Sequence, residues 1–183
     1  MSAAPIQTPF RGVLYRSRTE ARWASFFHAL NIEARYEAEG FVLPNGAKYL
    51  PDFFISKFPL YIEVKPMAPT AAERRKAFWL FDLTKVPVLI VIGEPSSRQG
   101  EIFNSFFDGE LGRPSNTFFG GCRRCDQVAI AYEWGSVAHG YEPLGGCSNP
   151  LRCGDRDSSQ EVDKISAAID RCRDERFGFY PAA

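Results

Sequence analysis

Two acidic residues and a lysine lie inside the most apolar, strand-forming part of the chain. Asp52 immediately precedes one apolar run, and Glu63 and Lys65 close another. Because residues i and i+2 of a strand point to the same face, Glu63 and Lys65 must project together. Pro51 cannot donate to a sheet ladder, which favours an edge, a strand start or a bulge that turns Asp52 towards the next strand. The pattern predicts two carboxylates and an ammonium group converging at one end of a sheet.

The chemistry of such a cluster points to a divalent cation. Two close carboxylates repel each other unless something neutralises them, and oxygen ligands with open water positions suit Mg²⁺ or Mn²⁺. A metal there would polarise a phosphate and lower the pKa of a bound water, while Lys65 would orient or activate that water and stabilise developing negative charge. In the alternative interpretation, Glu63 and Lys65 form a solvated strand face and Asp52 ends a turn. The apolar surroundings of Asp52 and Glu63 favour the metal site.

The segments around this cluster predict an α/β core with a mixed sheet. A helix is expected from about residue 18 to 30, with Ser17 as its N-cap and an apolar stripe along one side. The other expected elements are strands at 34–37, 41–43, 47–55, 60–65 and 86–92, a hairpin turn at Asn45-Gly46, a second helix at 70–83, and a leader without regular structure at 1–10. The order is therefore helix, β-meander, helix and buried strand.

A cysteine cluster follows this core, in a stretch rich in Gly, Pro, Ser and Asn. Cys122 and Cys125 form a CxxC pair, and Cys147 and Cys153 form a looser second pair. Zn²⁺ holds four thiolates tetrahedrally and would stabilise a segment with little core of its own, which predicts a structural zinc site resembling a knuckle or ribbon. His139 could replace Cys147 or Cys153 as a ligand. A redox pair and unliganded cysteines are the other interpretations, although a thioredoxin-like context is missing.

Basic residues are clustered although the formal net charge is zero. A neutral chain does not suggest a nucleic-acid-binding protein, but phosphate contacts depend on local charge. Arg16 and Arg18 lie just before and within the first expected helix, and Arg123 and Arg124 lie inside the CxxC loop. We expect these four arginines to contact DNA. The alternative is that they are simply solvated faces of the protein.

Three parts are expected along the chain. Residues 1–93 would form the core that carries the acidic cluster, and residues 94–157 the cysteine-rich appendage. Residues 158–183 would form a C-terminal helix and tail that pack on the core, because apolar residues recur on one face of 159–173, with Cys172 among them. We expect Cys172 to be a core residue rather than a metal ligand.

The sequence Pro51-Asp52 followed by Glu63-Val64-Lys65 resembles the motif of the PD-(D/E)xK nuclease superfamily, and segment 15–24 resembles the opening of its small phage-type members. The resemblance covers about residues 13–93. It implies a restriction-endonuclease-like core, a mixed central sheet flanked by helices. It further implies that Glu20 completes the metal site and that the Val64 carbonyl is a metal ligand. Glu20 also stands at the capping-box position after Ser17, and a Glu bonded to its own N-cap is expected to point away from the sheet.

The resemblance implies a Mg²⁺-dependent deoxyribonuclease with Glu20, Asp52, Glu63 and Lys65 as its catalytic residues, and an endonuclease rather than an exonuclease. Fold and motif do not choose the substrate, so action on RNA stays open. Two alternatives belong to other classes. One is a nucleic-acid-binding module that keeps the nuclease fold without cutting, and the other is a phage-encoded regulatory or inhibitor protein.

The same sequence sets expectations about location and assembly. Apolar runs such as 86–92 are far shorter than the roughly 18–20 residues that a membrane span needs. No signal peptide is visible, which predicts a cytoplasmic protein, in the bacterial host if the chain is phage-encoded. Many members of the superfamily act as dimers, so the resemblance leaves a homodimer open.

Overall fold

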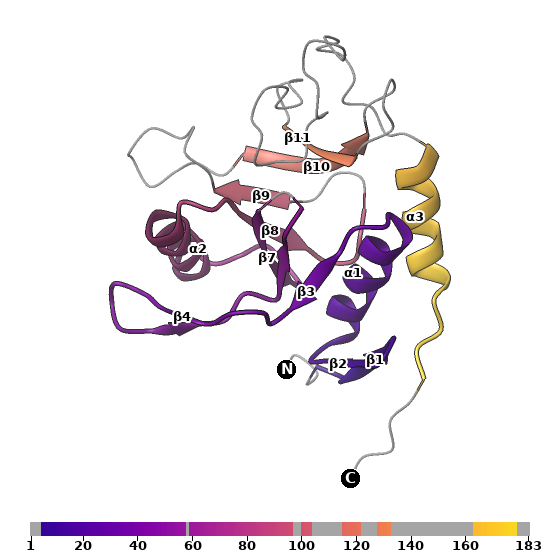
Figure 1. The fold of residues 1–183 in the computed structure, drawn as a ribbon, viewed down its shortest axis with the longest axis horizontal. Helices are drawn as coiled ribbons and strands as arrows, with labels where there is room; N and C mark the ends of the chain where they lie inside the picture. Colours follow the sequence, from indigo (N-terminus) through magenta and orange to yellow (C-terminus); the bar gives the residue numbers. More distant parts are fainter. Residues whose placement is uncertain are drawn as a thin grey trace.

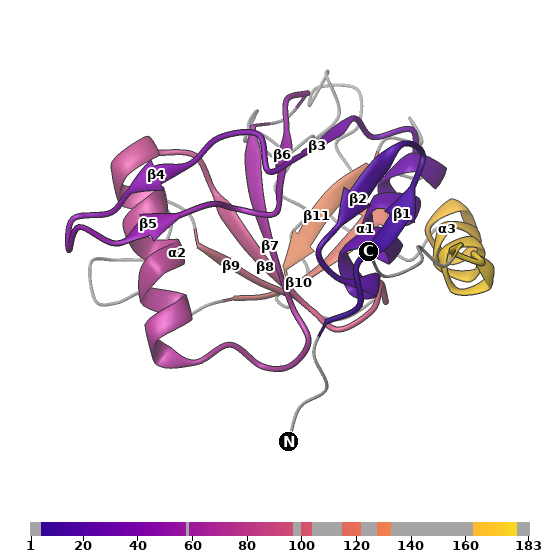
Figure 2. The ribbon, with the colours of Figure 1, turned by 90° about the horizontal axis from the view of Figure 1, so that it is seen from below.

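The computed structural model describes residues 5–57, 59–96, 100–103, 115–121, 128–132 and 163–178. Within these ranges the chain has three helices, α1 (Arg18–Ala29), α2 (Ala71–Thr84) and α3 (Asp163–Asp174). Helices α1 and α3 lie on one side of the strands and α2 lies on the other (Figures 1 and 2). None of these described helices is long and apolar enough to cross a membrane.

A seven-stranded sheet separates the helices, in the order β11-β10-β9-β8-β7-β6-β3. Its strands are β3 (Ala34–Tyr36), β6 (Phe53–Ile55), β7 (Leu60–Lys65), β8 (Val88–Ile92), β9 (Gly100–Phe103), β10 (Ser115–Gly121) and β11 (Val128–Tyr132). Strands β7 and β8 are parallel and all the other neighbours are antiparallel. The predicted mixed sheet in an α/β protein is therefore confirmed.

Strand β7 divides the apolar core in two because its side chains alternate between the faces of the sheet. Leu60, Ile62 and Val64 belong to the cluster that packs against α1 and α3. Tyr61 belongs to a second cluster, which includes Leu80 of α2. By the same alternation, Glu63 and Lys65 project on the α2 side of the sheet.

Helix α1 begins and packs as the sequence predicts. The Ser17 side chain accepts a hydrogen bond from the Glu20 N–H at 3.2 Å, so the expected N-cap is confirmed. Trp23, Phe26 and Phe27 are almost completely buried. They hold α1 against the sheet and against α3, whose buried face includes Cys172 as expected. Burial raises the pKa of the Cys172 thiol to about 11.

The expectation that residues 1–10 lack regular structure is wrong for residues 8–10. Strand β1 (Thr8–Phe10) pairs with β2 (Val13–Tyr15) in a separate two-stranded sheet. The two residues between them, Arg11 and Gly12, both have positive φ, at 48° and 82°. Such a turn suits the twist of a hairpin, but Arg-Gly is not the usual Asn-Gly signal, so the sequence gives little warning of it.

The single strand expected at 47–55 is divided into two in the structure. Strand β5 (Lys48–Tyr49) pairs with β4 (Phe41–Val42), and the predicted turn at Asn45-Gly46 joins them, with Gly46 at a φ of 80°. The chain then leaves the ladder and β6 begins only after Asp52. Pro51 lies in the break, where its missing N–H costs no ladder hydrogen bond.

The central sheet does not end at residue 93, where we expect the core to end. Strands β9, β10 and β11 extend it beyond β8. They were missed because β10 reads Ser-Asn-Thr-Phe-Phe-Gly-Gly, without regular alternation. Cys122, Cys125, Cys147, Cys153 and His139 lie outside the described residues, so the zinc site stays a prediction.

Candidate functional site

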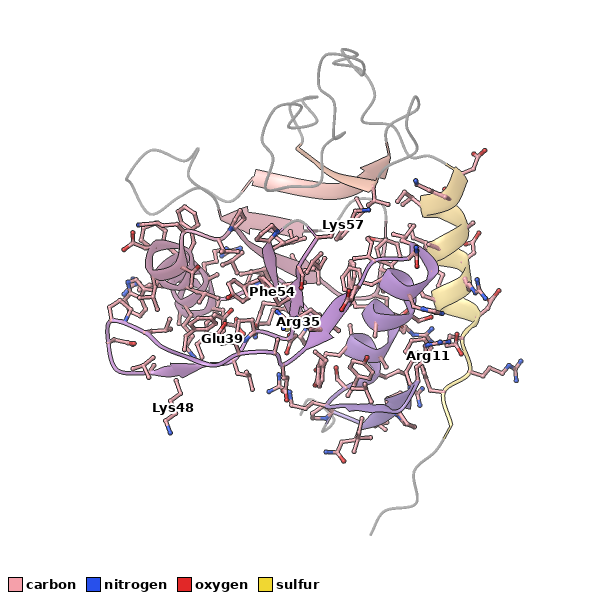
Figure 3. All side chains as sticks on the ribbon, in the orientation of Figure 1. Arg11, Arg35, Glu39, Lys48, Phe54 and Lys57 are labelled. Carbon is pink, nitrogen blue, oxygen red and sulfur yellow. The ribbon has the colours of Figure 1, made fainter. Side chains whose placement is uncertain are left out.

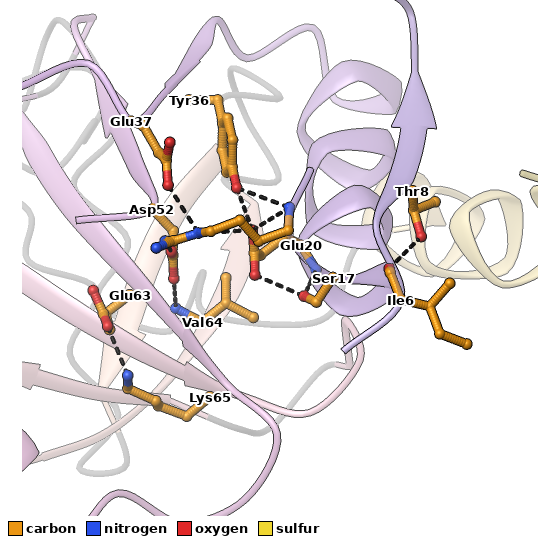
Figure 4. A network of polar contacts seen from close by, with 11 residues as sticks. Ile6, Thr8, Ser17, Glu20, Tyr36, Glu37, Asp52, Glu63, Val64 and Lys65 are labelled. Atoms are coloured by element: carbon orange, nitrogen blue, oxygen red, sulfur yellow. Dashed lines mark hydrogen bonds and ion pairs between the residues drawn. The ribbon is translucent and has the colours of Figure 1, made fainter. Parts of the chain in front are cut away.

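The candidate site lies where β6 and β7 run past the end of their ladder. Phe53 pairs with Ile62, so the antiparallel register places Asp52 opposite Glu63. The Val64 N–H donates a hydrogen bond of 2.7 Å to Asp52 Oδ2, which fixes that carboxylate to β7 (Figure 4). The structure thus brings Asp52 beside Glu63 and Lys65. The metal-ligand role of the Val64 carbonyl stays a prediction.

Asp52 is strongly perturbed by its surroundings. Asp52 is only 3% exposed. Burial, and next the charge of Glu63, raise the pKa of its carboxyl group to about 7, while the Val64 N–H and Arg16 oppose the rise. At neutral pH this carboxyl group is therefore close to the balance between its protonated and ionised forms.

Glu63 and Lys65 lie on the same face of β7, as the spacing predicts. Lys65 Nζ donates to Glu63 Oε1 at 2.7 Å. The other oxygen, Glu63 Oε2, is buried and has no hydrogen-bond partner within the described part of the chain. Burial lowers the pKa of Lys65, but Glu63 and then Glu73 outweigh it, and the pKa lies above its ordinary value. Lys65 is thus firmly protonated at neutral pH.

Helix α2 contributes a residue to the site that the sequence analysis missed. Glu73 Oε1 lies 3.3 Å from Lys65 Nζ. The same Glu73 closes a capping box with Thr70, and this hydrogen bonding lowers the pKa of its carboxyl group. The pattern Thr-Ala-Ala-Glu after the motif is a visible capping signal. It indicates a helix start at the site, but not a contact with Lys65.

A buried tyrosine was also missed. Tyr49 of β5 is 9% exposed and lies in the apolar cluster on the α2 side. Burial raises the pKa of its hydroxyl well above the ordinary value, and the charge of the nearby Glu63 and hydrogen bonding to it raise the pKa further. Tyr49 therefore keeps its proton beside the acids. An aromatic residue in a short strand is ordinarily a core residue, so nothing in the sequence distinguishes it.

Glu20 is bonded at the start of α1 and still lies at the site. Ser17 Oγ donates to Glu20 Oε1 at 2.7 Å, and the Tyr36 hydroxyl and the Arg16 N–H donate to Oε2. Its charge nevertheless contributes to the raised pKa of Asp52. Glu20 does not accept a hydrogen bond from the Ser17 N–H, so it forms no capping box, and the expectation that a capping-box Glu20 points away from the sheet is not tested.

Arg16 pairs with acids of the site in the structure. Its Nη2 lies 2.6 Å from Asp52 Oδ1 and its Nε lies 2.8 Å from Glu37 Oε1. Desolvation lowers its pKa, but Tyr36, Asp52 and Glu37 outweigh this and raise it. The predicted DNA contact of Arg16 stays a prediction, and its guanidinium now has a second role as the partner of Asp52.

The other expected phosphate-binding arginines differ in what the structure says of them. Arg18 is exposed on the first turn of α1. Arg123 and Arg124 lie outside the described residues. Arg22, which also lies on α1, donates to the carbonyl oxygens of Cys172 and Arg173 and joins α1 to α3.

The basic residues labelled in Figure 3 do not gather at one place. Arg11 lies near the lower end of α3, Lys48 projects away from the β4–β5 hairpin, and Lys57 lies near the centre of the view, below β10. Arg35 is placed over the Phe54 ring, 5.0 Å from its centroid. These four residues therefore do not form a single basic patch.

A cavity of about 350 Å³ lies apart from the acids, between the β1–β2 hairpin and the ends of α1 and α3. His28, Arg171 and Arg176 line it together with the rings of Phe10 and Phe177. Basic side chains near the C-termini of helices are stabilised by the helix dipoles. Their presence therefore has a structural explanation, and none of the site acids lines the cavity.

Asp52 and Glu63 supply the hard oxygen donors that Mg²⁺ or Mn²⁺ prefers. Within the described ranges, no three His, Cys, Asp or Glu side chains are grouped closely enough to hold a metal ion in the present arrangement. The unpartnered, buried Glu63 Oε2 is the feature that fits a cation, because a buried carboxylate oxygen without a partner is costly. Asp52 Oδ1 is instead engaged by Arg16.

No known protein family matches the chain, and no similar curated protein or solved structure was found.

Proposed function

We propose that this protein is a metal-dependent nuclease that hydrolyses phosphodiester bonds in DNA, built on a restriction-endonuclease-like core. The observation that carries the proposal is the meeting of Asp52 and Glu63 at the end of β6 and β7, with Lys65 on the same face and Glu63 Oε2 without a partner among the described residues. A purely structural role would not explain two buried acids at this end of the sheet, because burying charged groups is unfavourable.

Asp52 and Glu63 would hold Mg²⁺ or Mn²⁺, with Glu20 next to them. When bound, such an ion supplies charge to polarise the scissile phosphate and lowers the pKa of a water. Asp52 would bind it in the ionised form, so affinity should increase as the pH rises through about 7.

Lys65 would act as a cation toward the phosphate. Its raised pKa keeps the proton on Nζ at neutral pH, so it cannot readily remove a proton from water. A protonated Nζ can instead donate to a phosphate oxygen as negative charge develops in the transition state. Of the two roles considered from the sequence, the contacts of Lys65 with Glu63 and Glu73 favour charge stabilisation.

The proposal is tested by incubating the protein with supercoiled, linear and single-stranded DNA in Mg²⁺ or Mn²⁺, with and without EDTA. We expect metal-dependent cutting that falls at least about 100-fold in Lys65→Ala. Lys48→Ala is the matched control, because Lys48 is exposed and projects outward from the β4–β5 hairpin (Figure 3). Circular dichroism would verify that both variants fold.

Near-normal cutting by Lys65→Ala would overturn the proposed site. Binding of DNA without cutting of any form would favour the non-cleaving nucleic-acid-binding module. That alternative has one observation in its favour, since Arg16 neutralises Asp52 in the structure. The preferred DNA form would separate nicking, endonuclease and exonuclease action.

A further inference from the structure

Arg16 occupies a position that a metal ion would need. Its backbone N–H donates to Glu20 Oε2 at 3.2 Å and to the Tyr36 hydroxyl at 3.0 Å, which fixes the main chain before α1. From there the guanidinium reaches Asp52 at 2.6 Å, Glu37 at 2.8 Å and Glu20 at 3.9 Å. Three acids thus surround one cation.

The oxygens of the two motif acids are used unequally. Asp52 Oδ2 accepts from the Val64 N–H and Asp52 Oδ1 accepts from Arg16. Glu63 Oε1 accepts from Lys65, which leaves Oε2 as the oxygen without a partner in the described residues. A cation bridging both acids finds Glu63 Oε2 without a partner, but it competes with Arg16 for Asp52 Oδ1. A guanidinium and a divalent ion at one oxygen would repel each other strongly.

The geometry allows the Arg16 guanidinium to move away from Asp52. Its side chain is 52% exposed, whereas the Asp52 side chain is 5% exposed. Glu37, with a side chain 29% exposed, contacts Nε rather than Nη2. The guanidinium can therefore release Asp52 while it stays near Glu37 at the surface, and the main chain need not move.

We infer that Arg16 is a displaceable counter-cation, which neutralises Asp52 until a divalent metal takes its place and which thereby sets the metal affinity of the site. The inference rests on the proposed function. A monovalent ion offers Asp52 no more charge than the guanidinium and no hydrogen bonds, so displacement favours a divalent ion.

The test is Mn²⁺ binding by the full chain, followed as the loss of the EPR signal of free Mn²⁺. Wild type is compared with Arg16→Gln, with Asp52→Asn and with Arg18→Gln. Arg18→Gln is the matched control, because it removes the same charge from an exposed position two residues away. The titration is run at about pH 8.5, above the pKa of Asp52, so that a proton does not replace the guanidinium.

We expect Arg16→Gln to bind Mn²⁺ roughly tenfold more tightly than wild type, since one charged hydrogen bond no longer competes. Arg18→Gln should stay within about twofold of wild type, because an exposed charge is screened, and Asp52→Asn should lose the site. Arg16→Lys should lie between wild type and Arg16→Gln, because a single ammonium cannot contact Asp52 and Glu37 with two separate nitrogens. Arg16→Lys also replaces Arg16→Gln as the test variant if Arg16→Gln does not fold.

A second readout follows Arg16 itself, by ¹⁵N NMR of its Nε–Hε group during a Mg²⁺ titration. The signal should shift in wild type and stay in place in Asp52→Asn. If wild type binds Mn²⁺ through Asp52 but Arg16→Gln binds no more tightly than Arg18→Gln, the inference is wrong and the proposed metal site stands. If neither wild type nor Arg16→Gln binds Mn²⁺, the proposed metal site and the inference both fail.

Discussion

Helices α1 and α2 begin with the same capping pattern, a hydroxyl residue followed three positions later by Glu, but the two glutamates have different partners. Ser17 and Thr70 are the N-caps, and Glu20 and Glu73 follow three positions later. The Thr70 N–H donates a hydrogen bond of 2.8 Å to Glu73 Oε2, which completes an ordinary capping box. Glu20 bonds to the Ser17 hydroxyl, the Arg16 N–H and the Tyr36 hydroxyl instead. The same local signal therefore leads to two sets of partners.

The difference follows from where each helix starts. Helix α1 begins beside Asp52, so Glu20 lies among acids and its side chain is only 10% exposed. Helix α2 begins beside Lys65, and the Glu73 side chain is 34% exposed. One helix start thus adds negative charge to the site, whereas the other adds a partner for its lysine. We expect Glu20 to matter more for metal binding and Glu73 more for the position of Lys65.

The sharpest comparison of the two helix starts is between Glu20→Gln and Glu73→Gln in DNA cleavage. Gln retains the length of the side chain and can still serve a capping box. Glu20→Gln should lower kcat/KM about 100-fold, because it removes a charge next to Asp52, and Glu73→Gln about tenfold, because Lys65 keeps Glu63. Equal losses in the two variants would contradict the distinction.

The raised pKa of Asp52 makes a prediction for stability. In the folded protein this carboxyl group titrates at about 7, against an ordinary value of 3.8. The folded state therefore binds more protons than the unfolded state between these values, and the stability that the protonated group contributes is lost as the pH rises through about 7.

Asp52→Asn should consequently be more stable than wild type at about pH 8, by at most about 4 kcal/mol, and the difference should shrink towards about pH 4. Urea unfolding at several pH values would measure it. Glu20→Gln should also lower the pKa of Asp52, whereas Glu73→Gln should change it less, because Glu73 contacts Lys65 and is not among the main causes of the shift. Parallel pH profiles for wild type and Asp52→Asn would show that Asp52 is not perturbed.

The smallest expected effect is the difference in unfolding free energy between variants of the two N-caps. Thr70→Ala should cost about 0.5–1 kcal/mol of unfolding free energy, as for an exposed cap. Ser17→Ala should cost about 1–1.5 kcal/mol, since it also removes the hydroxyl that holds Glu20 Oε1. Guanidinium denaturation of both variants would measure the difference, and a larger loss for Thr70→Ala would reverse the comparison.

Local patterns in the sequence were sufficient for the elements that carry the site. The apolar stripe of α1, the turn at Asn45-Gly46 and the spacing of Glu63 and Lys65 all depend on residues a few positions apart, and the structure agrees with each. Strands β9 to β11 were not predicted by such patterns, because apolar and polar residues do not alternate regularly in them. Their place in the sheet depends on the pairing of β9 with β8. Sequence alone gave no reason to extend the sheet past residue 93.

By itself, the sequence determined that Asp52, Glu63 and Lys65 would meet, because a short hairpin leaves adjacent strands few registers and period-two alternation sets the faces. Only the tertiary structure decided their partners. Arg16 reaches Asp52 and Glu73 reaches Lys65 from two helix starts on opposite sides of the sheet. Those approaches follow from how apolar helix faces pack on the sheet, a long-range constraint that no local spacing contains.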